Sequence, residues 1–246
     1  MKTSQQTILI TGGGSGIGLA IAQAFACQDN QLILVGRDDT KLTAAAAPLA
    51  NTRIFQADLT QATDMDRLVR YLETEIGQLS LLINNAGIAR AYQLSAQAGA
   101  ETIAQAEFAT NFFAVVRLTE KLLPLLGQQS QAAIVNISSI VSYVPSTRLS
   151  TYSASKAALH SYTQSLRLTL EQTTPQVQVF EVFPPFVDTP MTQAFSLAKL
   201  PASVIADDLL AALAASEFEV HNGMAKSVYA NYLQAPDQVV RTFNQL

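Results

Sequence analysis

Three polar side chains that suit proton transfer occur close together in the sequence. Tyr152 and Lys156 belong to the segment Tyr-Ser-Ala-Ser-Lys, and Ser139 lies thirteen residues before the tyrosine. Four residues is about one helical turn, so the phenol and the ammonium share one face of a helix. A neighbouring positive charge lowers the pKa of a phenol, which is ordinarily about 10. With a serine hydroxyl to hold a substrate oxygen, the group predicts proton exchange with an alcohol or a carbonyl oxygen. A solvated helix face is the alternative for an isolated Tyr-x-x-x-Lys pair.

A second motif is a glycine-rich turn between an apolar run and a helical pattern. The segment reads Ile-Leu-Ile-Thr-Gly-Gly-Gly-Ser-Gly-Ile-Gly over residues 8–18, with the spacing Gly12-x-x-x-Gly16-x-Gly18. Glycine allows the backbone to take a positive φ and to approach a pyrophosphate. The N–H groups at the start of the following helix then face the anion. The context predicts a dinucleotide-binding turn, and a flexible glycine turn is the alternative.

The end of the second apolar run predicts which dinucleotide binds. Gly36 stands where an acidic residue would hydrogen-bond the adenosine ribose of NAD, and Arg37 follows directly. A planar guanidinium suits a 2′-phosphate, so we expect NADP(H) rather than NAD(H). Asp38 and Asp39 stand close enough to reach a ribose and leave NAD open. Asp58, after the third run, either hydrogen-bonds an adenine amine or caps a helix.

The elements that must position these groups alternate along the chain. Continuous apolar runs rich in β-branched and aliphatic residues predict strands, and amphipathic stretches between them predict helices. Such an alternation indicates a doubly wound parallel sheet covered on both faces, in a single α/β domain over residues 1–246. The strands are expected at 8–10, 32–35, 53–57, 79–83, 132–137 and 177–183, with a short edge strand at 218–220; the helices are expected at 17–25, 64–76, 102–126, 153–170 and 206–215.

Composition excludes several classes of function. The chain has 246 residues, of which 49% are hydrophobic and 14% charged, and its net charge is −4. Lysine and arginine do not cluster, which argues against nucleic-acid binding. No apolar stretch approaches the roughly 20 residues of a membrane span, and no secretion-type apolar run precedes the first motif, so we expect a cytoplasmic protein.

The single cysteine and the two histidines carry little predicted chemistry. Cys27 excludes an intramolecular disulfide and is expected to pack in the core on the apolar side of a helix. His160 and His221 have no spacing typical of a metal site, so we expect no metal. His160, one turn past Lys156, is expected to be a packed or interface histidine rather than a catalytic one.

The motifs together carry a family resemblance. With Asn-Asn-Ala-Gly at 84–87 and Asn111 between the glycine turn and the tyrosine motif, the chain resembles the short-chain dehydrogenase/reductase family over nearly its whole length. The resemblance implies a Rossmann-type sheet of about seven parallel strands in the order 3-2-1-4-5-6-7, with the site at their carboxyl ends.

The resemblance also implies roles for individual residues. Tyr152 would be the general acid in reduction and the general base in oxidation, with Ser139 polarising the carbonyl. Lys156 would bind the nicotinamide ribose hydroxyls and lower the pKa of the tyrosine. Asn111 would kink its helix and hold a water that relays protons to Lys156. The residues implied to contact the cofactor are Gly12, Ser15, Gly16, Ile17, Gly18, Arg37, Asp58, Leu59, Asn85, Ala86, Gly87, Tyr152, Lys156, Pro184, Val187 and Thr189.

One segment departs from the family pattern. After the sixth strand the family usually has Pro-Gly and then a threonine that contacts the cofactor, whereas this chain has Pro184-Pro185 and then Thr189. The double proline stiffens the connection to a substrate lid expected near 190–205. Together with Gly36-Arg37 and the tail at 218–226, this segment resembles a bacterial subgroup of oxidoreductases named after the lipoteichoic-acid D-alanylation operon.

The expected substrate pocket is apolar. Its predicted residues are Ser139, Tyr143, Val144, Phe186 and Met191. They favour a small hydrophobic ketone or aldehyde, and hence an NADPH-dependent carbonyl reductase or alcohol dehydrogenase. Arg90 could clamp an anionic group, and a solvated loop arginine is the alternative.

Two other readings of the family pattern stay open. One is a protein that binds NADP(H) as a sensor without catalysis, because fold alone does not fix function. The other is an epimerase or dehydratase of the extended branch, which generally has a larger C-terminal substrate domain. A homodimer or homotetramer paired through the helices at 102–126 and 153–170 is expected in each case.

Overall fold

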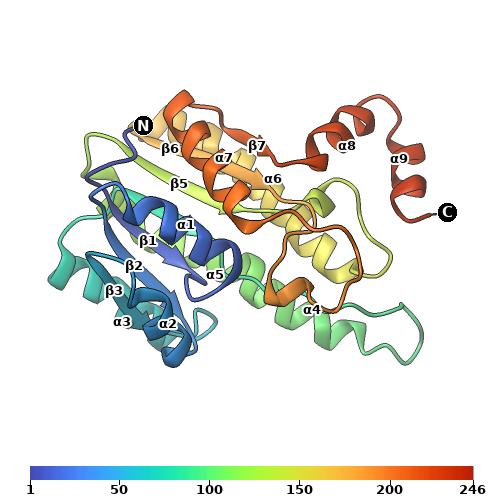
Figure 1. Cartoon of the computed structure of the whole chain (residues 1–246), viewed down its shortest axis with the longest axis horizontal. Helices are drawn as coiled ribbons and strands as arrows, with labels where there is room; N and C mark the ends of the chain where they lie inside the picture. The colour runs from blue at the N-terminus through green and yellow to red at the C-terminus, as the bar shows by residue number, and fades with distance from the viewer. Residues whose placement is uncertain (246) are drawn as a thin grey trace.

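The computed structural model describes residues 1–245 and is built on a seven-stranded parallel sheet (Figure 1). Its strands are β1 (Thr7–Thr11), β2 (Gln31–Gly36), β3 (Thr52–Gln56), β4 (Leu81–Asn84), β5 (Ala132–Ile137), β6 (Val177–Phe183) and β7 (Glu219–His221). They lie in the order β3-β2-β1-β4-β5-β6-β7, which confirms the predicted fold class and strand order. All strands run parallel, but the order in which the chain adds strands reverses between β1 and β4. This reversal opens a crevice at the carboxyl ends of the two strands, where ligands bind in such sheets.

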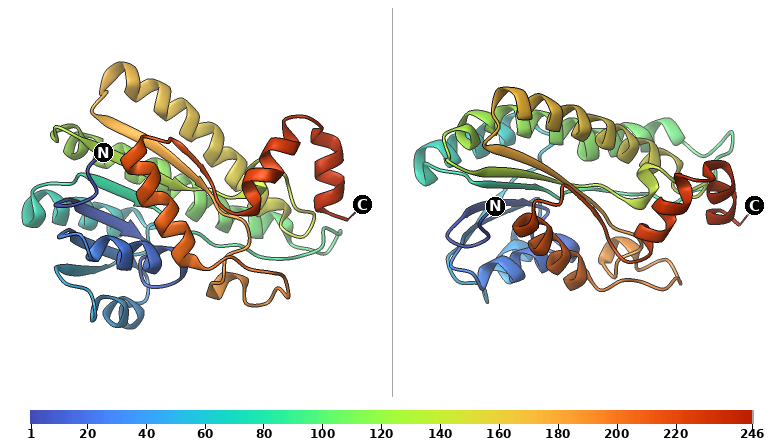
Figure 2. Two further views of the ribbon diagram at one scale, coloured as in Figure 1. Left: turned by 45° about the horizontal axis from the view of Figure 1, so that its top comes forward. Right: turned by 90° about the horizontal axis from the view of Figure 1, so that it is seen from above.

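Helices cover both faces of the sheet (Figure 2). The helices α1 (Gly16–Ala26), α2 (Asp39–Ala46) and α7 (Ala202–Ala215) pack on one face, while α3 (Ala62–Tyr71), α5 (Ala114–Gly127) and α6 (Ser150–Thr173) pack on the other. Successive strand residues point to opposite faces, so Ile8 and Ile10 belong to the first apolar layer and Leu9 to the second. Both layers are fully buried, which explains why the strands read as continuous apolar runs.

Two of the predicted helices are interrupted by wider turns. The helix expected at 102–126 consists of α4 (Ala100–Phe108), a π-helical turn (Ala109–Phe113) and α5, and the helix expected at 64–76 continues from α3 into a π-helical turn (Leu72–Ile76). Hydrophobic periodicity cannot show one extra residue in a turn. Single π turns often occur at functional sites, and the turn at Ala109–Phe113 contains Asn111.

The segment between β6 and α7 forms a strap over the carboxyl ends of the strands. Its two ends are joined by backbone hydrogen bonds, from the Leu200 N–H to the Phe186 carbonyl oxygen (2.8 Å) and from the Asp188 N–H to the Leu200 carbonyl oxygen (2.9 Å). A short 3₁₀ turn (Pro190–Thr192) lies within it. We call residues 186–200 the strap.

The C-terminal helices were absent from the prediction. The helices α8 (Met224–Tyr232) and α9 (Pro236–Phe243) lie at one end of the sheet, beyond β7. They close a third apolar cluster around Tyr143, Phe183 and Ala225. Cys27 is a correction: it was expected in the core, but α1 ends at Ala26 and the thiol lies exposed just past the apolar face.

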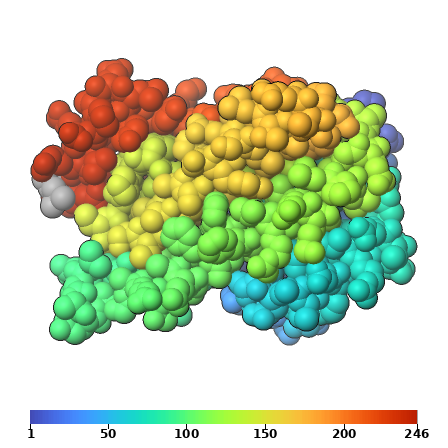
Figure 3. All heavy atoms as spheres, turned by 180° about the vertical axis from the view of Figure 1, so that it is seen from behind, coloured from blue at the N-terminus to red at the C-terminus, as the bar shows by residue number. Residues whose placement is uncertain are grey.

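The face of the molecule opposite to α1 and α7 is formed largely by α5 and α6. The two helices run side by side across it, with α4 at one end (Figure 3). Phe113, just before α5, and Leu168, on α6, are 56% and 60% exposed. Within residues 1–245, no helix combines the length and apolar character needed to cross a membrane.

Candidate active site

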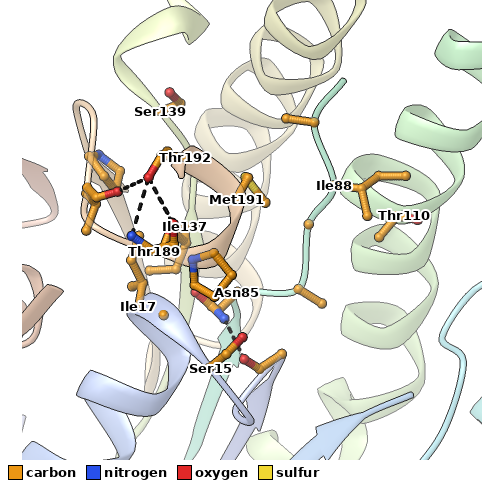
Figure 4. Close-up of a pocket in the computed structure, with 18 of the residues that line it drawn as sticks. Ser15, Ile17, Asn85, Ile88, Thr110, Ile137, Ser139, Thr189, Met191 and Thr192 are labelled. Carbon is orange, nitrogen blue, oxygen red and sulfur yellow. Dashed lines mark hydrogen bonds between the residues drawn. The ribbon is translucent and has the colours of Figure 1, made fainter. Parts of the chain in front are cut away.

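A cavity of about 370 Å³ opens at the carboxyl ends of the central strands. Its walls are the glycine turn, the segments after β4 and β5, the start of α6 and the strap (Figure 4). The cavity brings together most of the residues predicted for the site: Gly12, Ser15, Gly16, Ile17, Arg37, Asp58, Leu59, Asn85, Ala86, Gly87, Ser139, Tyr152, Lys156, Pro184, Phe186, Val187, Thr189 and Met191. Gly18, Asn111, Tyr143 and Val144 do not line it.

The glycine turn lines the cavity at the start of α1. Gly16 has a φ of +55°, and an added Cβ would lie 3.0 Å from the Cγ2 atom of Thr189 in the strap. Ser15 precedes the helix without a side-chain cap, so the first N–H groups of α1 stay available to an anion. Gly18 lies behind the turn, where an added Cβ would be 2.4 Å from the Gly12 carbonyl oxygen. Gly18 therefore serves close packing of helix against strand rather than contact with a ligand.

The turn is held from the side by Asn85. Its Nδ2 group donates to the carbonyl oxygens of Thr11 (2.9 Å) and Gly12 (3.3 Å). The Thr11 hydroxyl in return accepts hydrogen bonds from the N–H groups of Asn85 and Ala86, at 2.9 and 3.0 Å. The Asn-Asn-Ala-Gly segment thus fixes the glycine turn to the end of β4, because each buried polar group finds a partner.

Two cations lie at the far end of the cavity, beyond β2. Both Arg37 and Lys41 line it, and sequence reasoning missed Lys41. The Asp38 carboxylate caps α2 by accepting from the Lys41 N–H at 3.1 Å, and its Oδ2 atom also lies 3.5 Å from the Lys41 ammonium. This backbone hydrogen bond lowers the pKa of Asp38. Asp38 is one of the two aspartates that were expected to be able to reach the ribose of NAD, and it serves as a helix cap.

Asp58 forms a turn of its own after β3. Its Oδ1 atom accepts from the N–H and the hydroxyl of Thr60, at 3.0 and 2.8 Å. The residue that precedes α3 is Gln61, so Asp58 is not the N-cap that was one of its two predicted roles. The residue and its neighbour Leu59 still line the cavity, beside the space between Arg37 and the glycine turn.

The three proton-transfer groups come from two elements. Ser139 follows β5, where its Oγ atom accepts from the Val141 N–H at 3.3 Å, and Tyr152 and Lys156 lie one turn apart on α6. The Lys156 Nζ atom donates to the carbonyl oxygen of Ile137 at 2.8 Å and lies 5.8 Å from the centre of the Tyr152 ring. The ammonium is therefore tied to the end of β5 rather than to the phenol.

Burial controls the protonation of this group. Burial raises the pKa of Tyr152 to about 12; the Ser139 hydroxyl opposes this and the charge of Glu107 adds to it. Burial also lowers the pKa of Lys156 to about 8, against the effect of Glu181. In the cofactor-free protein, desolvation of the phenolate dominates, so the pKa of Tyr152 is raised. The predicted effect of Lys156 on the tyrosine stays a prediction. The phenol is protonated at neutral pH.

Asn111 lies behind the cavity, in the π-helical turn between α4 and α5. Its side chain accepts from the Ile88 N–H and donates to the Ile88 carbonyl oxygen, both at 2.9 Å, and donates to the Ser155 hydroxyl at 3.0 Å. A Cβ added to Gly87 would lie 3.3 Å from the Asn111 Oδ1 atom and 3.9 Å from the Lys156 Nζ atom. The asparagine thus joins α6 to the segment after β4, next to the lysine.

Two residues expected in the substrate pocket are packed in the core instead. The Tyr143 ring is buried in the third apolar cluster, and its hydroxyl donates to the Ala225 carbonyl oxygen at 3.2 Å. Val144 has no exposed surface. The C-terminal helices α8 and α9 cover this position, and the sequence prediction did not include them.

Other residues form the wall on that side. Those that the sequence prediction did not include are Ile88, Thr110 and Leu149. Ile88 lies in a loop, Leu149 just before α6 and Thr110 in the π-helical turn Ala109–Phe113, where no periodic pattern indicates which side chain points inward. Figure 4 shows Ile88 and Thr110 across the cavity from Ser139 and Thr189. At the rim, the Arg148 guanidinium lies 5.6 Å from the ring centre of Phe195, which links the strap to the start of α6.

The fold and this site are those of a known family. Residues 6–199 match the family described as short chain dehydrogenase. The chain therefore belongs to the short-chain dehydrogenase family of oxidoreductases, as its motifs predicted.

Particular relatives agree with the predicted subgroup. The uncharacterized oxidoreductase DltE of Bacillus subtilis is 36% identical over 195 residues, which are 78% of this chain and 76% of that protein. A fatty acyl-CoA reductase of Acinetobacter baylyi is 30% identical over 93% of this chain and 80% of its own length. A short chain dehydrogenase from Burkholderia cenocepacia, solved in complex with NADP, superimposes with a TM-score of 0.86 and 26% identity over 98% of both chains.

Proposed function

We propose that the protein is an NADPH-dependent reductase of hydrophobic ketones or aldehydes. The observation that carries this proposal is that Tyr152 and Ser139 line the same cavity as the glycine turn. Burial raises the pKa of this phenol to about 12, so it holds its proton at neutral pH and can give it to an alkoxide, which is a stronger base. A reduced nicotinamide bound in the cavity supplies the hydride.

The residues of the cavity suit NADP(H). The first N–H groups of α1, and the glycine turn that lines the cavity beside them, suit a pyrophosphate. Arg37 and Lys41 would hold the 2′-phosphate, because a guanidinium and an ammonium offer charged donors and Asp38 is occupied at its helix. Asp58 and Leu59 would contact the adenine, with Pro184, Val187 and Thr189 at the nicotinamide side.

The chain's own groups then handle the carbonyl oxygen. The Ser139 hydroxyl and the Tyr152 hydroxyl would both donate to it, and the phenol gives its proton to the forming alkoxide. The phenolate left behind is stabilised by the ammonium of Lys156, 5.8 Å from the ring centre. Asn111 holds Ile88 and Ser155 in place and would bind the water through which the phenol is reprotonated.

The substrate side of the cavity favours an apolar molecule. It is lined by Ile88, Val141, Leu149, Phe186, Met191 and Phe195. Arg90 does not line the cavity, so its side chain is not placed to clamp an acidic group there. The reductase of Acinetobacter baylyi is named for a fatty acyl substrate, and an acyl chain would suit the same apolar wall.

The experiment is NADPH oxidation against a panel of aldehydes and ketones of increasing chain length, with NADH as the cofactor control. The wild type is compared with Tyr152→Phe, which keeps the ring and removes the proton donor. We expect turnover of apolar carbonyls that falls at least about a hundredfold in the variant. Tight NADPH binding without turnover in the wild type would favour the sensor, and turnover confined to charged substrates would contradict the apolar pocket.

The exposed face of α5 and α6 supports a second proposal, that the protein is a homodimer or homotetramer. Phe112 and Phe113, just before α5, lie in edge contact with ring centres 5.3 Å apart, and Phe113 is exposed, as is Leu168 on α6. Exposed aromatic and aliphatic side chains on adjacent helices are typical of an interface. Light scattering at micromolar concentration checks it: Phe113→Glu should yield monomers, and a monomeric wild type would exclude it.

A further inference from the structure

A charged pair, His160 and Glu181, lies behind Lys156. His160 follows Lys156 by one turn of α6, and its Nδ1 atom lies 2.9 Å from the Oε2 atom of Glu181 on β6. The Glu181 side chain has no exposed surface, whereas 22% of the His160 side chain is exposed. The pair therefore extends from the interior of the protein to its surface and joins β6 to α6, the helix that also carries Tyr152 and Lys156.

The glutamate is only partly satisfied where it lies. Its Oε1 atom is buried and has no hydrogen-bond partner among residues 1–245. A buried carboxylate with one free oxygen is costly in free energy. An apolar residue would fit a central strand better, as the flanking Phe180 and Val182 do, both fully buried. The carboxylate thus opposes folding and calls for another role.

The Lys156 ammonium lies over the neighbouring strand, because its Nζ atom donates to the carbonyl oxygen of Ile137, which pairs with Val182 next to Glu181. Residues four apart on a helix lie on one face, so Lys156 and His160 both point to the sheet from α6. Burial lowers the pKa of Lys156 to about 8, and the negative charge of Glu181 is the opposing influence. Without it, the lysine would lose its proton closer to neutral pH.

The other charges near the pair are matched among themselves. On β7, in register with Glu181, Glu219 pairs with Arg167 of α6 at 3.1 Å. The His221 Nε2 atom lies 3.9 Å from the same Glu219 carboxylate. Tyr152 is protonated at neutral pH, and the charge of Glu107 on α4 acts on this phenol. Glu181 is the carboxylate whose charge acts on Lys156.

We propose that Glu181 and His160 form a supporting pair for Lys156, in which the carboxylate stabilises the ammonium and the Nδ1–H group of the histidine fixes the carboxylate under α6. Both are positioning residues: neither lines the cavity. The effect on catalysis rests on the proposed reductase function, whereas the effect on the protonation of Lys156 does not.

The pair also changes its charge with pH. The hydrogen bond to Glu181 raises the pKa of His160 above its ordinary value. Below that pKa the imidazolium and the carboxylate cancel, and above it the pair carries one negative charge. Its support of the ammonium therefore strengthens as the pH rises towards the range in which Lys156 begins to lose its proton.

The test is an NMR titration of lysine side chains labelled at Cε and Nζ, in the cofactor-free protein. The variants are Glu181→Gln, which keeps shape and hydrogen bonding but removes the charge; His160→Asn, which keeps a donor near the Nδ1 position; and the control Glu219→Gln on the adjacent strand. We expect Glu181→Gln to lower the measured pKa of Lys156 by about one pH unit, and the other two variants to leave it near the wild-type value. Thermal melting checks that each variant folds.

The outcomes separate this inference from the reductase assignment. An unchanged Lys156 titration in Glu181→Gln, or an equal shift in Glu219→Gln, would overturn the pair's role whether or not the enzyme turns over. The wild type gives the same test without substitution, because the Lys156 signals should show a second inflection where the His160 ring titrates, and its absence would count against the proposal. If reduction is established, the alkaline limb of kcat/KM should move to lower pH in Glu181→Gln alone.

Discussion

The two halves of the sheet are built differently. In β1 and β2 the interior residues are aliphatic and fully buried, from Ile8 to Ile10 and from Leu32 to Val35. In β4, β5 and β6 a row of buried polar residues crosses the sheet in register: Asn84 opposite Asn136, and Asn136 opposite Glu181. The row continues to Glu219 at the edge.

The difference shows where each half carries its function. The apolar half is a scaffold, and its chemistry lies in the turns that leave it, at the glycine turn and at Arg37. The polar half carries chemistry inside its layers. Asn84 donates to Asn136 at 2.9 Å, and Asn136 donates at 2.9 Å to the Thr163 hydroxyl of α6. The helix that bears Tyr152 and Lys156 is thus attached to the sheet by directional bonds as well as by packing.

The largest expected effect is in the apolar half, at Gly18→Ala. The added methyl group would lie 2.4 Å from the Gly12 carbonyl oxygen, which is backbone and cannot move aside without shifting the turn. We expect a loss of about 3 kcal/mol in the free energy of unfolding, measured in urea, together with weaker NADPH binding. Gly14→Ala is the matched control, because its Cβ would meet neighbours at an ordinary 3.5 Å. Equal behaviour of the two variants would contradict the rigid turn.

Cofactor choice should change at the end of β2 without a change in stability. Arg37→Asp removes the guanidinium proposed to hold the 2′-phosphate and introduces repulsion. The ratio of kcat/KM for NADPH to that for NADH should fall by about a hundredfold, while the melting temperature stays near the wild-type value because the side chain is exposed. Lys41→Gln should act in the same direction and less strongly. An unchanged ratio in Arg37→Asp would exclude the assignment to NADP(H).

In the polar half, a core substitution should affect stability and catalysis together. Asn136→Leu leaves Asn84 and Thr163 without their shared partner. We expect a loss of about 2 kcal/mol in the free energy of unfolding, and a lower kcat from a less firmly held α6. Ile134→Val, two residues earlier on the same strand and also fully buried, is the control: it should cost about 1 kcal/mol with kcat preserved. Loss of kcat in both variants would remove the distinction between the halves.

The smallest effect concerns pH. Because the pKa of Lys156 is lowered to about 8, the fraction of protein with the ammonium falls as the pH rises above that value. Reduction should therefore slow about tenfold per pH unit beyond the alkaline limb. Tyr152, whose pKa is raised to about 12, stays protonated over the same range. Stopped-flow rates from pH 6 to 10 locate the limb, and a flat profile up to pH 10 would contradict the control by Lys156.

The sequence predicted the parts of the site that depend on short stretches of chain. The glycine turn, the Tyr-x-x-x-Lys pair and the strand pattern are local, so their spacing already places Gly16, Tyr152 and Lys156. Tyr143 and Cys27 were misplaced because their surroundings depend on distant or terminal elements: α8 and α9 for the first, and the end of α1 for the second. The contact of His160 with Glu181 joins residues 21 apart on different elements, and only the sheet register brings them together.

The strap is closed at its base by backbone hydrogen bonds. Two backbone hydrogen bonds join Leu200 to Phe186 and Asp188, so the chain leaves the sheet and returns to it at nearly the same point. We expect the tip of the strap, residues 193–199, to tolerate exchange or lengthening with little consequence for the sheet, as in a surface loop whose ends are already closed. In evolutionary terms, substrate range could then change separately from fold stability, and chimaeras that exchange this tip between relatives would test it.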